Sequence, residues 1–227
     1  MAGMVTDNTT DYTTPILLAV EAAEGRLPAK KRLLVSAAVE CFAEHGFAAT
    51  STRMIASRAG VAEATIFRHY QTKKDLLVRL VEPVLDQLIL PGMDAQLTEI
   101  HPQKLDLAEL VRWVMANRLA YAREFAPLVR IVIQELPVNT ELRAMVVGKL
   151  GTKIKTIIAS EIRRLAPDLR MTPTEIDRML RTVVSLLVGI FLAKELGPPD
   201  QSWDDEAEVD AAAEMIIRTY LTPPKNP

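Results

Sequence analysis

Apolar residues recur every three or four positions along most of the chain, which is the spacing of amphipathic α-helices. Alternating β-branched runs, which would mark half-buried strands, are absent. The pattern therefore predicts an all-α protein. The expected helices cover residues 28–45, 51–59, 61–70, 73–90, 105–125, 127–136, 139–166, 174–196 and about 205–220.

Local signals set the ends of several of these helices. Thr172-Pro173-Thr174-Glu175 has a hydroxyl at the cap, proline at the first position and Glu at the third, which predicts a helix start. Thr72 is expected to cap the next helix after Tyr70, and Pro83 inside that helix is expected to bend it. Residues 91–102 are rich in Pro, Gly and polar residues and are expected to form a linker.

The segment Ser51–Tyr70 predicts two short helices broken at Gly60, with Ser51 or Thr52 as the first cap. Such a pair is either a helix-turn-helix, whose second helix enters the DNA major groove, or an ordinary helical hairpin. The second helix surrounds a single inward Ile66 with small and polar residues, which favours close approach to DNA.

With its flanks, from about Lys30 to Leu80, this segment resembles the DNA-binding domain of TetR-family transcriptional regulators. The resemblance covers about fifty residues and rests on Leu34, Ala37, Ala38, Phe42, Gly46-Phe47, Ile55-Ala56, Ala59-Gly60-Val61, Thr65-Ile66-Phe67, His69-Tyr70 and the stretch Lys73–Leu76. It implies a fold with an N-terminal three-helix helix-turn-helix domain and a larger C-terminal helical domain that binds ligand and dimerises. We expect an arm at residues 1–27 that is largely disordered, the DNA-binding domain at 28–88 and the ligand-binding and dimerisation domain at 89–227.

The resemblance also implies which residues face DNA. Arg68 and His69 are expected at phosphates, Lys73 is expected to be the main phosphate anchor, and Phe67 stands where the family commonly has a tyrosine. Glu63 either accepts from a cytosine amino group or only places a favourable charge at a helix N-terminus. The full predicted set is Thr52, Arg53, Ala62, Glu63, Ala64, Thr65, Phe67, Arg68, His69 and Lys73.

Charge is unevenly distributed along the chain. The net charge is −2, yet nine basic residues face four acidic ones between Pro28 and Leu80. A basic module on an acidic body is typical of a nucleic-acid binder whose bulk does not touch the polyanion.

Other chemistry is sparse. The single cysteine, Cys41, favours a reducing, cytoplasmic location, and Cys41 with His45 would make half a metal site that lacks a second ligand pair. We expect no metal, cofactor, catalytic residue, signal peptide or membrane partner. The longest apolar run, Val183–Ala193, is too short to span a bilayer.

The helix expected at 174–196 is apolar nearly all round in its second half, so it is either central to its own monomer or covered by a second subunit. Ser185, Gly189 and Ala193 form a small-residue stripe, and we predict a homodimer seam there with the last helix. The predicted interface residues are Val183, Ser185, Leu186, Gly189, Ile190, Ala193, Val209, Ala212, Ala213, Ile216 and Tyr220.

An effector cavity is expected between the helices at 105–125, 127–136 and 139–166, with the helix at 73–90 closing it. Its predicted polar and aromatic lining is Trp113, Asn117, Tyr121, Arg130, Gln134 and Glu135. The sequence thus predicts a homodimeric repressor that a small lipophilic ligand releases from a palindromic double-stranded DNA operator. The alternatives are a ligand-independent architectural DNA binder and an all-α enzyme, and an enclosed, partly apolar cavity would favour the sensor.

Overall fold

The computed structural model describes residues 13–100, 104–198 and 202–221, and within these ranges all regular structure is helical. The chain packs into two compact units. The first unit comprises residues up to Pro91 together with Glu124–Val146, and the second comprises Gly92–Arg123 and the residues from Val147 onward. The division falls inside α6 (Leu90–Ile100) and α9 (Thr140–Leu165), and it leaves Glu124, the last residue of α7 (Leu107–Glu124), in the first unit.

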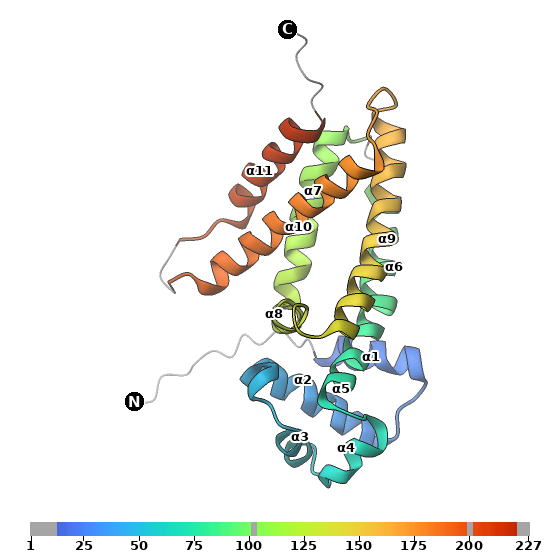
Figure 1. The fold of residues 1–227 in the computed structure, drawn as a ribbon, viewed down its shortest axis with the longest axis vertical. Helices are drawn as coiled ribbons and strands as arrows, with labels where there is room; N and C mark the ends of the chain where they lie inside the picture. Colours follow the sequence, from blue (N-terminus) through green and yellow to red (C-terminus); the bar gives the residue numbers. More distant parts are fainter. Residues whose placement is uncertain (1–12, 101–103, 199–201, 222–227) are drawn as a thin grey trace. The chain divides into compact units, whose positions relative to one another are not determined.

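The first unit contains the N-terminal helices and one segment from the middle of the chain, Glu124–Val146 (Figure 1). Helix α2 packs against both α3 and α8, while α1 packs on α5 and α2. Its elements are α1 (Thr13–Glu24), α2 (Ala29–Ala49), α3 (Thr52–Arg58), α4 (Glu63–His69), α5 (Lys73–Val84), the π-helical turn η1 (Leu85–Ile89), α8 (Ala126–Glu135) and the start of α9 (Thr140–Leu165).

Helix α1 corrects the expectation of a largely disordered arm at residues 1–27. Ile16, Ala19 and Val20 are all at most 2% exposed, so one face of α1 is part of the core of the first unit. The stretch was misjudged because its small residues and threonines give a weak amphipathic signal on their own. Residues 1–12 of the predicted arm lie outside the described residues.

The chain turns inside the first unit where the sequence signals predict it. Gly46 interrupts α2 with φ 76° and ψ 163°, a backbone conformation open essentially only to glycine. The Ser51 hydroxyl accepts a hydrogen bond from the Met54 amide at 3.1 Å, and the Thr72 hydroxyl accepts from the Asp75 amide at 3.0 Å. Both predicted caps are confirmed.

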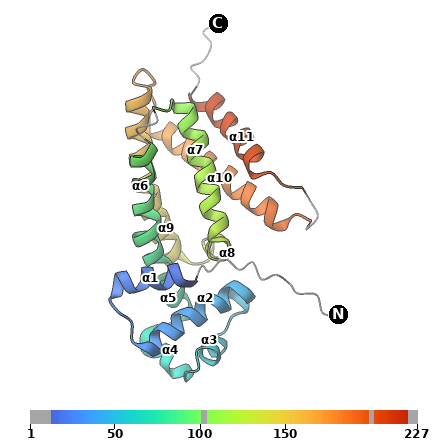
Figure 2. The ribbon, with the colours of Figure 1, turned by 180° about the vertical axis from the view of Figure 1, so that it is seen from behind.

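The second unit is a layered bundle of longer helices. Figures 1 and 2 both show α10 and α11 side by side, and these two helices are in contact. Its elements are the main part of α6 (Leu90–Ile100), α7 (Leu107–Glu124), α9 from Val147 onward, α10 (Pro173–Leu196), α11 (Asp205–Ile216) and the π-helical turn η3 (Ile217–Leu221).

Helix α6 corrects the expectation of a linker at residues 91–102, of which residues 101–103 lie outside the described ranges. Proline normally breaks a helix because it lacks an amide hydrogen and its ring meets the carbonyl four residues earlier. Here the π turn Leu85–Ile89 comes first, with the Leu90 amide donating to the Leu85 carbonyl. The wider turn accommodates Pro91 in the first turn of α6, and the helix continues.

The division into units also differs from the predicted boundary at residue 88. Residues 124–146, expected in the C-terminal domain, pack with the first unit instead, because α8 lies on α2. Ile131 of α8 is 5% exposed and Leu142 at the start of α9 is fully buried, so residues 124–146 contribute to the core of the first unit.

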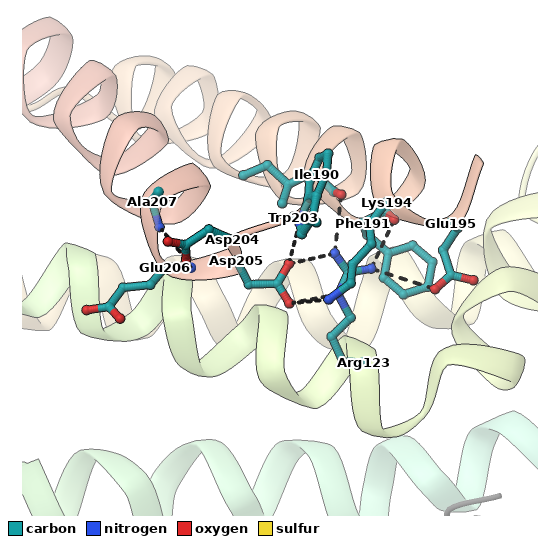
Figure 3. A network of polar contacts seen from close by, with 10 residues as sticks. All are labelled: Arg123, Ile190, Phe191, Lys194, Glu195, Trp203, Asp204, Asp205, Glu206 and Ala207. Atoms are coloured by element: carbon teal, nitrogen blue, oxygen red, sulfur yellow. Dashed lines mark hydrogen bonds and ion pairs between the residues drawn. The ribbon is translucent and has the colours of Figure 1, made fainter. Parts of the chain in front are cut away.

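A polar network ties α7 to α10 and α11 in the second unit (Figure 3). The Arg123 guanidinium donates to both carboxylate oxygens of Asp205, at 2.9 and 3.2 Å, and to the Phe191 carbonyl at 3.0 Å. Trp203 Nε1 donates to the same carboxylate at 2.7 Å and Lys194 Nζ at 3.2 Å. Burial alone would raise the pKa of Asp205, but these hydrogen bonds outweigh it and lower the pKa to about 2.

We expect Asp205→Asn to lower the unfolding free energy by about 1–2 kcal/mol at pH 7, after allowing for solvent screening. The folded-state pKa lies below the ordinary value of 3.8. The stabilisation is therefore present above pH 3.8 and is lost as the pH falls towards 2. Urea unfolding at a series of pH values should show the difference between wild type and variant shrink over that interval.

Asp210→Asn is the matched control, since Asp210 is exposed on the same helix and has no ion pair among the described residues. Equal losses in the two variants at pH 7 would contradict the role of the network.

Candidate nucleic-acid interface

Helices α3 and α4 form a compact pair whose inner sides are fully buried. Ile55 of α3 and Ile66 of α4 are both 0% exposed, and Tyr70 at the end of α4 is 2% exposed. Gly60 turns the chain between the helices with φ 64°, and the Val61 amide donates to the Ala56 carbonyl at 3.0 Å. The pair is the predicted helix-turn-helix, and the side chains on its inner side pack in the core.

The opposite side of α4 is exposed and carries the residues predicted to face DNA. Ala62 and Ala64 supply small side chains, and Phe67 is 54% exposed although it is a large aromatic residue. Arg68 and His69 are exposed beside them. A surface with small side chains, one open aromatic ring and cations suits contact with a groove and its sugar-phosphate walls.

The cations of the first unit divide into paired and unpaired ones. Arg58 pairs with Glu44 at 2.5 Å, and Arg79 pairs with Asp75 at 2.9 Å, so these two arginines already have counter-ions. Arg53, Arg68 and Lys74 are exposed and have no ion pair among the described residues. Their charges are available to a polyanion.

Glu63 is held by the other helix of the pair. The Thr52 hydroxyl, in the first turn of α3, donates to the Glu63 carboxylate at 2.6 Å. Glu63 also lies in the first turn of α4, where a negative charge is favourable. This hydrogen bond joins the N-termini of α3 and α4, and both roles considered for Glu63 stay predictions.

Lys73 corrects the prediction of a phosphate anchor. Its ammonium donates to the carbonyls of Phe47 and Thr50, both at 2.6 Å, and lies 4.4 Å from the centre of the Phe47 ring. Because its donors are used inside the chain, Lys73 fastens the segment between α2 and α3 to the start of α5. Desolvation lowers the pKa of Lys73, as expected for an ammonium drawn into the protein.

An apolar cavity of about 170 Å³ lies wholly within the second unit. Four long helices supply most of its wall, and nearly all of the side chains are aliphatic or Met. The lining residues are Met93, Gln96, Leu97, Leu107, Leu110, Val111, Trp113, Val114, Met115, Arg118, Ile154, Ile157, Ile158, Glu161, Ile162, Met179, Leu180, Val183, Val184, Leu187, Ile216 and Leu221.

The position of this cavity differs from the predicted one. Of the six predicted lining residues only Trp113 contributes to the wall. Asn117 and Tyr121 lie on α7 outside it, and Arg130, Gln134 and Glu135 belong to α8 in the first unit. The lining from α6 and α10 was missed because α6 was taken for a linker and α10 for a subunit seam. The spacing of Met93 and Leu97, four residues apart, was the available signal.

The predicted dimer residues also separate into two groups. Ile190, Val209, Ala212, Ala213 and Ile216 are at most 8% exposed, since α10 and α11 bury them against their own unit. These five therefore offer a partner little or no surface, and only the exposed members of the predicted interface are available for contact. Val183 and Leu186 are half-buried, Val183 in the cavity wall, and the Tyr220 hydroxyl lies 2.9 Å from that of Thr182.

An exposed face remains on the same two helices. Ser185, Gly189 and Ala193 are exposed along α10, Leu196 at its end is 81% exposed, and Met215 of α11 is 51% exposed. The small-residue stripe therefore lies on the surface of the second unit, and its role in a dimer seam stays a prediction.

Two other sequence features were considered: the single cysteine as a metal ligand and the longest apolar run as a membrane span. Cys41 is buried, and burial raises the pKa of its thiol. The described residues hold no cluster of three or more His, Cys, Asp or Glu side chains arranged for a metal ion. No helix within the described ranges is long and apolar enough to cross a membrane.

Comparison with known proteins agrees with this geometry. Residues 34–80 match the family model described as "Bacterial regulatory proteins, tetR family", which spans α2 to α5 and includes the whole helix-turn-helix. Residues 34–80 of the chain thus form a DNA-binding domain of the TetR type. This domain holds the helix-turn-helix formed by α3 and α4.

Two sequence relatives are named regulators. The chain is 38% identical over 56 residues to the "Fatty acid metabolism regulator protein" of Bacillus subtilis (strain 168), covering 25% of this chain and 29% of that protein. It is 24% identical over 159 residues to the "HTH-type transcriptional repressor AcnR" of Corynebacterium diphtheriae, covering 62% and 83%. The chain thus spans less than a third of the length of the first relative.

The TetR-type fold extends over most of the chain. The crystal structure of the regulator FadR from Bacillus subtilis in complex with stearoyl-CoA aligns with a TM-score of 0.64. The alignment covers 82% of this chain and 97% of that one at 21% sequence identity, so the shared feature is the fold.

We expect Lys73→Met to destabilise this TetR-family domain, because the carbonyls of Phe47 and Thr50 lose their donor while the side-chain volume is kept. Urea unfolding should show a loss of about 1–3 kcal/mol. Lys74→Met is the control, since Lys74 is exposed and unpaired among the described residues, and should change stability by less than about 0.5 kcal/mol. Equal stabilities of the two variants would contradict the structural role of Lys73.

Proposed function

We propose that this TetR-family regulator is a homodimeric repressor that binds a palindromic operator and is released by a small lipophilic ligand. The exposed side of α4 carries this proposal. Its small residues, the open Phe67 ring and the unpaired Arg68 lie on the second helix of a helix-turn-helix. The proposed DNA contacts are those predicted from the sequence, with the exposed Lys74 in place of Lys73.

Phosphate contacts position such a helix and base contacts specify the sequence. Arg53, Arg68 and Lys74 are the proposed phosphate ligands because their charges have no partner among the described residues. Ala64 and Thr65 are proposed to meet base edges, where a short side chain allows a thymine methyl to approach. One helix of seven residues reads few base pairs, so a second copy supplies the remaining specificity.

The exposed stripe of α10 is proposed as the centre of the dimer seam. Small residues at Ser185, Gly189 and Ala193 allow close approach of a second helix, and Leu196 and Met215 supply apolar area to bury. Two recognition helices held at one separation would read a two-fold-symmetric site.

The apolar cavity supports release by a lipophilic effector. A volume of about 170 Å³ is close to that of cavities that bind benzene, and it lies below the range of about 300–1,000 Å³ typical of drug-sized ligands. A larger ligand must therefore push the lining helices apart. Because α6 continues through the π turn from α5, a shift of α6 is passed along the backbone towards the helix-turn-helix.

The relatives support the same class of effector. One is named a fatty acid metabolism regulator and another was crystallised with stearoyl-CoA, a lipophilic acyl compound. To switch an operator from almost fully occupied to almost empty, the ligand must favour the non-binding form by about 5 kcal/mol. As a DNA-binding repressor the protein would act in the cytoplasm.

The proposal is tested by selecting bound fragments from random duplex DNA and then screening lipophilic compounds for release of the selected duplex. A palindromic consensus and at least one releasing compound are expected. Selected fragments without two-fold symmetry would overturn the dimeric operator, and tight binding that no compound relieves would favour a ligand-independent architectural protein.

Arg68→Ala is expected to weaken binding to the selected duplex and to make the slope of log K against log salt shallower by about 0.9, the value for one lost phosphate contact. Fluorescence anisotropy between 50 and 300 mM salt measures the slope. Arg163→Ala should leave it unchanged, since Arg163 is an exposed base on α9 in the second unit. A slope for Arg68→Ala equal to that of wild type would remove Arg68 from the phosphate contacts.

Gly189→Leu is expected to shift the protein from dimer to monomer. A Cβ added at Gly189 meets no atom of the chain within 4 Å, so the larger side chain is accommodated in one protomer and obstructs only a neighbour. Light scattering measures the mass. Gly148→Leu on α9 is the control, because Gly148 is exposed and its Cβ also meets nothing within 4 Å. If both variants remain dimeric, the seam lies elsewhere.

A further inference from the structure

Two of the cavity-lining side chains carry a charge, and only one of them has a counter-ion. Glu161, from α9, is 6% exposed and pairs with Arg164 at 2.6 Å. Arg118, from α7, forms no ion pair with any described residue. Each lies near the C-terminal end of its helix's share of the lining, and α7 and α9 run in opposite directions (Figure 1).

The surroundings of Arg118 are neutral. Its guanidinium donates to the side-chain carbonyl oxygens of Gln96 and Asn117, and it lies 5.1 Å from the centre of the Tyr121 ring. Desolvation lowers the pKa of Arg118, although an arginine side chain stays protonated at neutral pH. A half-buried guanidinium held only by neutral groups retains the electrostatic cost of an unpaired charge.

The length and volume of the cavity indicate the shape of the ligand. Lining residues of α7 run from Leu107 to Arg118, eleven residues or about 16 Å along the helix axis. A volume of about 170 Å³ spread over that length is narrow. It fits an unbranched aliphatic chain better than a fused ring system.

We propose that the effector is an unbranched aliphatic carboxylate whose head group pairs with Arg118 and whose tail extends along α7 towards Leu107. This inference rests on the proposed function and names the chemical class of its ligand. The planar guanidinium can donate two parallel hydrogen bonds to a carboxylate, a match that neither side-chain amide supplies. The carboxylate takes the place of Gln96 and Asn117, whose side chains rotate away.

The arrangement also excludes related compounds. An alcohol of the same chain length fills the apolar wall but leaves Arg118 without a counter-ion. An alkylammonium would place a second positive charge against the guanidinium. Selectivity should therefore follow the charge of the head group at constant tail length.

The test measures binding of decanoate, 1-decanol and decylammonium to the full-length protein by calorimetry. Decanoate is expected to bind at least about tenfold more tightly than decanol, and decylammonium is expected not to bind. Arg118→Met should weaken decanoate by about tenfold or more while decanol affinity stays within about twofold. Unchanged decanol binding also shows that the variant is folded. Arg118→Lys, which keeps the charge and loses the planar fork, should fall between wild type and Arg118→Met.

Arg112→Gln is the matched control, because Arg112 lies on the same helix but pairs with Glu214 at 3.0 Å, and it should bind decanoate as wild type does. Equal binding of decanoate and decanol, or a loss shared by Arg112→Gln and Arg118→Met, would overturn the role of Arg118. Absence of binding by all three compounds would overturn the alkyl-chain site itself. These outcomes would leave the proposed function intact, because that function is tested separately by release of the selected duplex by any lipophilic compound.

Discussion

Burial of one side of a seven-residue helix is the constraint on which the first unit depends. Helix α4 is too short to be stable alone, and its position is fixed by Ile66 and Tyr70, which pack in the core beside Ile55 of α3. The other side of α4 is exposed and takes no part in this packing, so small and cationic residues can occupy it. Lys73 supports the same arrangement by binding the carbonyls that follow α2.

The second unit uses its apolar residues in a different way. There α6, α7, α9 and α10 enclose space instead of filling it, and the network around Arg123 joins α7 to α10 and α11. Rigid ends and an underfilled middle allow a ligand to act on the middle without unfolding the bundle. The continuous backbone of α5, the π turn and α6 then provides a physical connection between ligand and DNA-binding module, as the proposed release requires.

Much of the fold could be predicted because local signals were strong. Hydroxyl caps at Ser51, Thr72 and Thr172 and the glycine breaks at Gly46 and Gly60 are set by nearest neighbours in the sequence. Helix α6 was missed because Pro91 was expected to end the helix. The π turn before it, which no residue pattern predicts, allows the helix to continue. Lys73 and the five buried residues of α10 and α11 were misassigned because sequence periodicity shows which side is apolar and does not show what covers it.

Tethered cleavage of DNA from α4 tests the central claim most directly. Ala64→Cys places an exposed thiol on this helix, and the native Cys41 is buried, so an iron chelate can be attached at one position per protomer. The account predicts two clusters of strand cleavage in the selected duplex, placed symmetrically about its centre and facing the major groove. Cleavage at a single cluster, or equal cleavage along any sequence, would contradict a paired recognition helix reading a two-fold-symmetric operator.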